Sequence, residues 1–105
     1  MAMDIGFIVY GLPLIDDIVQ LQNDEYLEHF DMRYNSFAIP TGFVGVQIGV
    51  ITPAAGPVML GDLPKPTGKQ IDDGHARVAK LPYEVKQAYD ELDMEEGVWI
   101  IWGSA

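Results

Sequence analysis

The stretch FVGVQIGVI at residues 43–51 decides how the rest of the chain is interpreted. It consists mainly of β-branched and aromatic residues, which favour a pleated strand over a helix. Residues 5–10 and 98–102 carry the same signal, and residues 34–39 carry a weaker one that is followed by a Pro-Thr-Gly turn at 40–42. The sequence therefore predicts four strands.

Two helices are predicted between these strands. Over residues 14–30 the apolar side chains, from Ile15 to Phe30, recur at helical spacing on one side, as in a helix packed on a core. Residues 82–93 show the same spacing, and Pro82 suits the first helical position because its φ is fixed. Both segments are therefore interpreted as amphipathic helices.

The order strand, helix, strand, strand, helix, strand predicts a single α+β domain over residues 1–105. The arrangement expected for this order is the two-layer, ferredoxin-like β-α-β-β-α-β fold, in which an antiparallel sheet carries both helices on one face.

One segment fits this order poorly. Residues 53–74 are rich in proline and glycine and are longer than an ordinary loop. We interpret them as an insertion that has a function or contains a short strand at 58–60. A helical turn is expected at 73–80, with a break at Leu81 because a residue before proline is biased away from helix.

The predicted sheet has two apolar faces, although the helices can cover only one of them. If the valines of residues 43–51 face the helices, the opposite face carries glycines, aromatic side chains and one amide. The residues on this face would be Tyr10, Gly45, Gln47, Gly49 and Trp99. Uncovered apolar patches are unusual on monomers, so we expect the 53–74 segment, a second copy in a homodimer or a small ligand to cover this face.

Acidic residues dominate the charge of the chain. Sixteen aspartates and glutamates stand against six lysines and arginines, which gives a formal net charge of −10. This charge disfavours direct binding to nucleic acid or to an anionic membrane, because both present negative surfaces. Basic, neutral or small partners are expected instead.

The acids are concentrated along the predicted helix at 14–30. On its exposed side lie Asp17, Asp24, Glu28 and Asp31. A second acidic run, at 90–96, lies where the helix dipole favours cations. Two interpretations remain open. The acids form a solvated face that promotes solubility, or they imitate a row of phosphates and occupy the basic groove of a nucleic-acid-binding partner.

No catalytic or cofactor motif stands out in the sequence. Without cysteine, the chain offers no disulfide, thiolate zinc site or cysteine nucleophile. Six residues separate Gly61 from Gly68, whereas a phosphate loop requires four. His75 follows Asp72 and Asp73, which we interpret as caps of a short helix. No cofactor and no metal are expected, and the apolar runs are too short to span a bilayer.

We therefore expect a soluble, cytoplasmic protein that acts by binding rather than by catalysis. The first hypothesis is a regulatory or inhibitory protein that engages a basic partner protein through the acidic helix face. The alternative is a small-ligand-binding module that uses the glycine and aromatic sheet face or a dimer cleft. A homodimer through that sheet face is expected.

Overall fold

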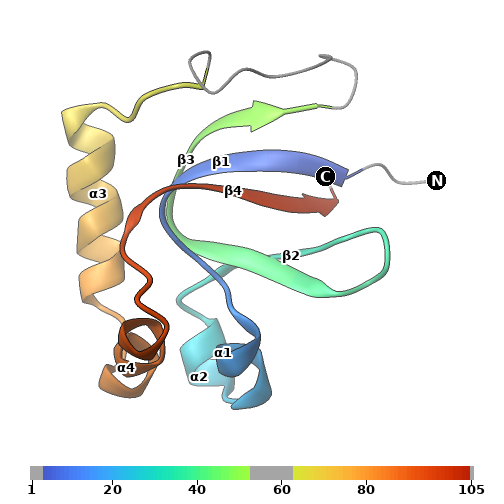
Figure 1. The fold of residues 1–105 in the computed structure, drawn as a ribbon, viewed down its shortest axis with the longest axis vertical. Coiled ribbons are helices and arrows are strands. Elements are labelled where there is room, and N and C mark those ends of the chain that lie inside the picture. Colours follow the sequence, from blue (N-terminus) through green and yellow to red (C-terminus); the bar gives the residue numbers. More distant parts are fainter. Residues whose placement is uncertain (1–3, 53–62, 105) are drawn as a thin grey trace.

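The computed structural model describes residues 4–52 and 63–104. Its strands are β1 (Asp4–Pro13), β2 (Asp31–Tyr34), β3 (Pro40–Ile51) and β4 (Gly97–Ser104). Its helices are α1 (Asp16–Gln20), α2 (Asp24–Leu27), α3 (Gly68–Ala79) and α4 (Tyr83–Glu91). The strands form one antiparallel sheet in the order β2-β3-β1-β4, and helices connect β1 to β2 and β3 to β4 (Figure 1). The predicted α+β class is confirmed.

The single helix predicted over residues 14–30 is wrong. Gln22 has a φ of 50°, which ends the first helical segment, and α2 starts anew after Asn23. The Asn23 side chain accepts hydrogen bonds from the backbone N–H groups of Glu25 and Tyr26. Asparagine is a strong N-cap and a weak helix-interior residue, so this position breaks the apolar pattern into two short helices.

The hairpin between β2 and β3 also differs from the prediction. Its turn lies at residues 35–39, where the Asn35 side chain accepts hydrogen bonds from the N–H groups of Phe37 and Ile39. Residues 40–42, predicted to be the turn, belong to β3. Local hydrogen bonding by the asparagine therefore replaces the expected strand at 34–39.

The segment expected to be an insertion ends in a long helix. In place of a short turn at 73–80, α3 begins at Gly68, where Thr67 and Gln70 form a capping box. This motif satisfies two free N–H groups and fixes the helix start. The predicted helix after Pro82 is confirmed as α4. Residues 53–62, with the predicted strand at 58–60, lie outside the described residues.

Two glycines allow β1 and β3 to approach each other closely. Gly11 and Gly45 face each other in the ladder with φ values of 153° and 137°. A Cβ on Gly11 would overlap the Val44 carbonyl oxygen, and one on Gly45 would overlap the Tyr10 carbonyl oxygen. Only glycine adopts this backbone conformation readily, so the pair allows both strands to bend sharply (Figure 1).

The core has a part on each face of the sheet. Toward the helices lie Leu12, Ile18, Phe30, Val44, Leu81, Val85 and Tyr89. On the opposite face lie Phe7, Val9, Phe43 and Ile101. The guanidinium of Arg33 lies 5.0 Å from the centre of the Phe7 ring. Arg33 and Thr41 also contact Gly103 at the far edge strand. The sheet therefore curls so that its own edges help to cover this second face.

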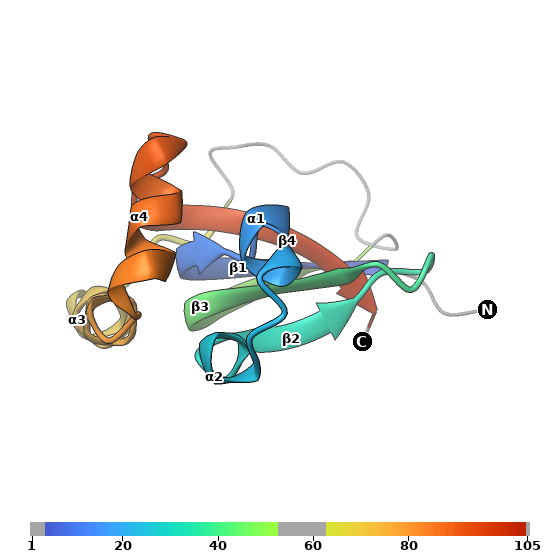
Figure 2. The same cartoon turned by 90° about the horizontal axis from the view of Figure 1, so that it is seen from below.

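The helices do not form a flat layer over the sheet. The longest, α3, runs along one end and packs against β1 and β3, whereas α4, α1 and α2 follow the adjoining side (Figures 1 and 2). This arrangement gathers three acid-rich elements at one side of the molecule.

Candidate functional site

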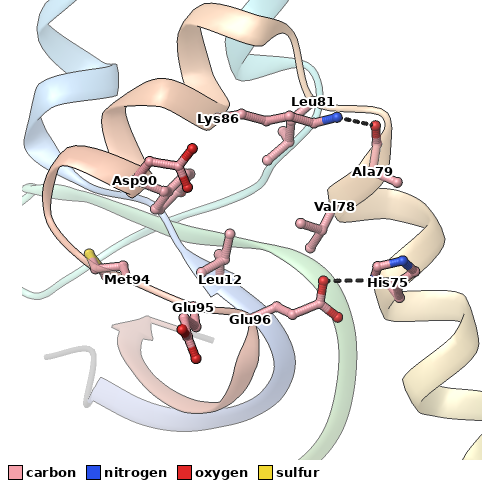
Figure 3. Close-up of a pocket in the computed structure, with 11 residues that line it drawn as sticks. Leu12, His75, Val78, Ala79, Leu81, Lys86, Asp90, Met94, Glu95 and Glu96 are labelled. Carbon is pink, nitrogen blue, oxygen red and sulfur yellow. Dashed lines mark hydrogen bonds and ion pairs between the residues drawn. The ribbon is translucent and has the colours of Figure 1, made fainter.

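A hollow in the described part of the chain lies between α3, α4 and the segment that leads into β4 (Figure 3). Its volume is about 540 Å³. The floor is apolar: Leu12, Leu81 and Tyr89 belong to the buried core, and Val78 and Met94 pack against them. The volume lies in the range of small-ligand pockets, and the floor can accommodate a hydrocarbon chain.

Two chain breaks create this hollow. Helix α3 ends at Ala79 and α4 begins at Tyr83, because Leu81 precedes Pro82 and is biased away from the helical conformation. The two helices therefore leave this corner in different directions. After α4, Asp93 adopts a φ of 54° and the Met94 N–H donates to the Tyr89 carbonyl at 3.0 Å. This turn holds Met94 and Glu95 at the opening.

The rim of the hollow carries three carboxylates, those of Asp90, Glu95 and Glu96. Glu96 is held on both sides: its Oε1 lies 2.7 Å from His75 Nδ1, and its Oε2 accepts a hydrogen bond from the Tyr10 hydroxyl at 3.0 Å. Burial, together with this hydrogen bond to Glu96, raises the pKa of Tyr10. Asp90 and Glu95 are exposed.

Among the described residues that line this hollow, the one lysine or arginine forms no ion pair with these acids. Lys86 Nζ donates instead to the Ala79 carbonyl at 2.7 Å, which ties α4 to the end of α3 (Figure 3). The rim is therefore negative above an apolar floor. Such an arrangement suits an ammonium or guanidinium group carried on a hydrocarbon stem.

The negative rim is part of a larger surface, which we call the acidic face. It comprises the acids of α1, α2, α4 and the residues that follow α2 and α4: Asp16, Asp17, Asp24, Glu25, Glu28, Glu84, Asp90, Glu91, Asp93, Glu95 and Glu96. Within the described residues, none of these eleven carboxylates forms an ion pair with a lysine or arginine. The face is therefore free to meet external cations.

The two acidic runs are far apart in sequence but meet in space. The Tyr26 hydroxyl of α2 donates to Glu84 of α4 at 2.6 Å. This hydrogen bond raises the pKa of Tyr26. Between α1 and α4 lies a second hollow of about 270 Å³, to which Asp17, Glu84 and Glu91 contribute. These contacts bring acids of α1 and α4, and a side chain of α2, close together.

The predicted partner-binding residues are all exposed, but they do not lie on one helix. Asp17 lies on α1, whereas Asp24 and Glu28 share the single turn of α2, with the Glu28 N–H donating to the Asp24 carbonyl. Asp31 begins β2 and lies 3.6 Å from Arg33. The evenly spaced row expected from one continuous helix is therefore absent from this segment.

Glu28 and Asp31 instead border a small hollow of about 200 Å³ beside α3. Arg77 of α3 also lines this hollow, and its guanidinium donates to the Gly45 carbonyl at 2.9 Å. Gly45, predicted to be on a ligand or dimer face, is buried at this position.

The five residues predicted to share one sheet face lie on two faces. Because of a register shift between Ile8 and Val9, Gln47 lies opposite Val9 while Gly49 lies opposite Ile8. Alternation then places Tyr10 and Gly49 on the side of Ile8, and Gly45, Gln47 and Trp99 on the other side.

Three of these residues have other contacts within the chain. Tyr10 packs against Gly74 of α3, and Pro64 covers Gly49. Trp99 packs on the Phe7 cluster, and its indole N–H donates to the Glu95 carbonyl at 3.3 Å. Gln47 is exposed. The predicted face is therefore not a common binding surface.

Sequence reasoning missed the pairing at the rim of the hollow. It placed His75 beside Asp72 and Asp73, whereas the imidazole contacts Glu96, which lies 21 residues away in sequence. Asp72 and Asp73 lie in the middle of α3, and Thr67 caps that helix. The sequence pointed to this site only through the acidic run at 90–96, which lies at a helix C-terminus where the dipole favours cations.

Comparisons with known proteins found no protein-family model, no curated protein and no solved structure that matches this chain. In the described ranges, no group of three or more histidine, aspartate or glutamate side chains is arranged to hold a metal ion. No helix within those ranges is both long and apolar enough to cross a membrane.

Proposed function

We propose that this chain is a non-catalytic binding protein that recognises a basic partner protein through the acidic face. A lysine or arginine side chain of the partner would enter the hollow between α3 and α4. The observation that carries this proposal is the group of eleven carboxylates on neighbouring elements, none paired with a lysine or arginine in the described part of the chain.

The chemistry of the hollow matches such a side chain. A lysine stem can lie against Leu12, Val78 and Met94, while its ammonium reaches Asp90 or Glu95. An ion pair at about 4 Å is worth about 4 kcal/mol gross at an effective dielectric constant of about 20, before desolvation is subtracted. The surrounding carboxylates add steering and accelerate encounter with a basic surface.

The regulatory form of this proposal is that the chain blocks a nucleic-acid-binding groove. The broken helix removes a regular phosphate-like row, yet the density of negative charge over α1, α2 and α4 still supports electrostatic mimicry. In that case duplex DNA and this chain would compete for the same basic protein.

The experiment is a titration of the chain with an oligolysine peptide, compared with a neutral peptide of the same length. The test variant carries Asp90→Asn and Glu95→Gln, two exposed rim positions. The control variant carries Asp72→Asn and Asp73→Asn on α3, so its net charge changes by the same amount. We expect at least a tenfold loss of affinity for the test variant, or about 1.4 kcal/mol, and less than about twofold for the control. Equal losses would mean that only net charge matters and would overturn the proposal.

The hollow itself favours a second candidate, a small amine ligand. Its volume of about 540 Å³ and its apolar floor resemble those of small-molecule sites. Butylammonium is a suitable probe because it reproduces the end of a lysine side chain. Binding of butylammonium as tightly as of the peptide would favour this candidate, whereas tighter binding of the peptide would favour a protein partner.

We also infer that the topology is a strongly curled form of the ferredoxin-like arrangement. The antiparallel strand order β2-β3-β1-β4 and the two helical connections support this inference. The departure lies in the helices, which are split into four pieces and gather at an end and a side of the sheet.

A further inference from the structure

Strand β4 forms an unusual edge of the sheet. Its eight residues, GVWIIWGS, include no charged residue and no proline. In the described part of the chain it pairs only with β1, so its other side offers free backbone donors and acceptors. Edge strands of soluble proteins are usually short, charged or interrupted, which prevents unwanted pairing. This edge lacks each of these protections.

The exposed side chains of β4 are also apolar. Val98 is 44% exposed and Trp102 is 49% exposed, and both lie on the same face as the half-buried Ile100. The opposite edge, β2, has only four residues and includes Asp31 and Arg33. On that side β3 continues beyond Phe43 without a strand partner in the described part of the chain, but α3 packs against β3 and Arg77 donates to the Gly45 carbonyl. The two edges of the sheet therefore differ.

The sequence of β4 is complementary to itself in an antiparallel pair. If a two-fold axis passes beside Ile100, Val98 lies opposite Trp102 of the second copy, and Trp99 lies opposite Ile101 of the second copy. Each aromatic residue then meets a smaller aliphatic one, the kind of cross-strand pair that stabilises sheets. Gly97 lies opposite Gly103 of the second copy, so this pair brings no side chains into the contact, although Arg33 and Thr41 of the same chain lie beside Gly103.

The distribution of charge leaves this edge as a place where two copies can meet. Two copies that each carry a net charge of −10 repel each other, so they have to meet where few carboxylates face one another. In the register centred on Ile100, Glu96 lies opposite Ser104 of the second copy rather than opposite an acid. The acidic face on α1, α2 and α4 remains outside the contact.

We propose that two copies of this chain pair through β4 and form one continuous antiparallel sheet across the two-fold axis. The interface is the edge of the sheet, not the glycine and aromatic face expected from the sequence. Backbone hydrogen bonds supply the attraction, and the Val98 and Trp102 pairs set the register.

Sedimentation velocity of the full chain over a concentration series tests this proposal. The wild-type chain should have twice the monomer mass at high concentration and dissociate on dilution. Val98→Lys should remain monomeric, because each interface would then carry two buried lysines. The control is Val50→Lys on β3, a position 53% exposed and away from the β4 edge, which should remain dimeric.

Amide hydrogen exchange of wild type provides a second readout that does not depend on a variant. Amides on the outer side of β4 should be protected at high concentration and exchange rapidly after dilution. Val98→Lys should still bind the oligolysine peptide, because it removes none of the eleven carboxylates of the acidic face. A wild-type monomer, or a dimer that survives Val98→Lys with a folded spectrum, would overturn the proposal. So would capture of a different protein's strand by a monomeric chain.

Discussion

Gly45→Ala tests the close approach of β1 and β3, on which the curl of the sheet depends. At a φ of 137° an alanine is strained, and its Cβ would overlap the Tyr10 carbonyl oxygen and lie 2.9 Å from the Gly11 Cα. Both neighbours are backbone atoms, so neither can rotate away as a flexible side chain could. The strands have to separate locally.

The expected loss in the free energy of unfolding has two contributions. A residue forced into a sparsely populated backbone region costs about 1–3 kcal/mol. Separation of the strands also weakens at least one ladder hydrogen bond, worth about 0.5–1.5 kcal/mol. We therefore expect Gly45→Ala to lower the free energy of unfolding by roughly 2–4 kcal/mol, a large part of the 5–15 kcal/mol that is usual for a domain.

Urea denaturation followed by circular dichroism measures this change. The matched control is Gly68→Ala at the start of α3, where nothing lies within 4 Å of the added Cβ. Alanine is the better helix former, so the control should be neutral or more stable by up to about 1 kcal/mol. A free energy of unfolding for Gly45→Ala within about 0.5 kcal/mol of wild type would refute the role assigned to the glycine pair.

Three further changes have defined outcomes. Glu28→Lys replaces the like-charge pair with Asp24 in the turn of α2 by an opposite-charge pair, so stability should rise by about 0.5 kcal/mol while affinity for oligolysine falls; unchanged affinity would exclude α2 from the acidic binding surface. Asn23→Ala removes the cap of α2 and should cost about 1 kcal/mol in urea denaturation, whereas no loss would mean that the cap contributes nothing. Tyr89 is buried and its hydroxyl donates to the Pro13 carbonyl at 2.6 Å; burial raises its pKa above the ordinary value, so the folded state retains this proton when the unfolded state loses it. The contribution of Tyr89 to stability should thus be complete below about pH 10 and fall by about 1.4 kcal/mol per pH unit above it, and Tyr89→Phe should reduce the alkaline slope by that amount; equal slopes for wild type and variant in urea titrations at alkaline pH would contradict this assignment.

The sequence alone predicts a strand or helix correctly where its residue pattern does not depend on contacts with other elements. Residues 43–51 were recognised as a strand because they are mainly β-branched and aromatic, and β3 spans Pro40–Ile51. The helix after Pro82 was recognised from its spacing and its start, and α4 spans Tyr83–Glu91. These signals are local, so a single sequence carries them.

Tertiary contacts account for what was missed. A glycine in the middle of α3 argues against a helix, yet Gly74 is needed because Tyr10 packs against it. The hollow forms only when α3, α4 and the start of β4 meet, and no local pattern brings His75 to Glu96. The helix break at Asn23 has a local signal, since asparagine precedes two acids there, but the apolar spacing from Ile15 to Phe30 gives no sign of it.

The central claim is that the acidic face and its hollow bind a cationic side chain. Mapping backbone amide chemical shifts during titration of the full chain with the oligolysine peptide tests it most directly. The account predicts saturable shifts concentrated at Val78, Leu81 and Met94 to Glu96, with smaller shifts on α1 and α2. Shifts that follow every exposed acid equally, including Asp72 and Asp73, or that leave the hollow unaffected, would contradict it.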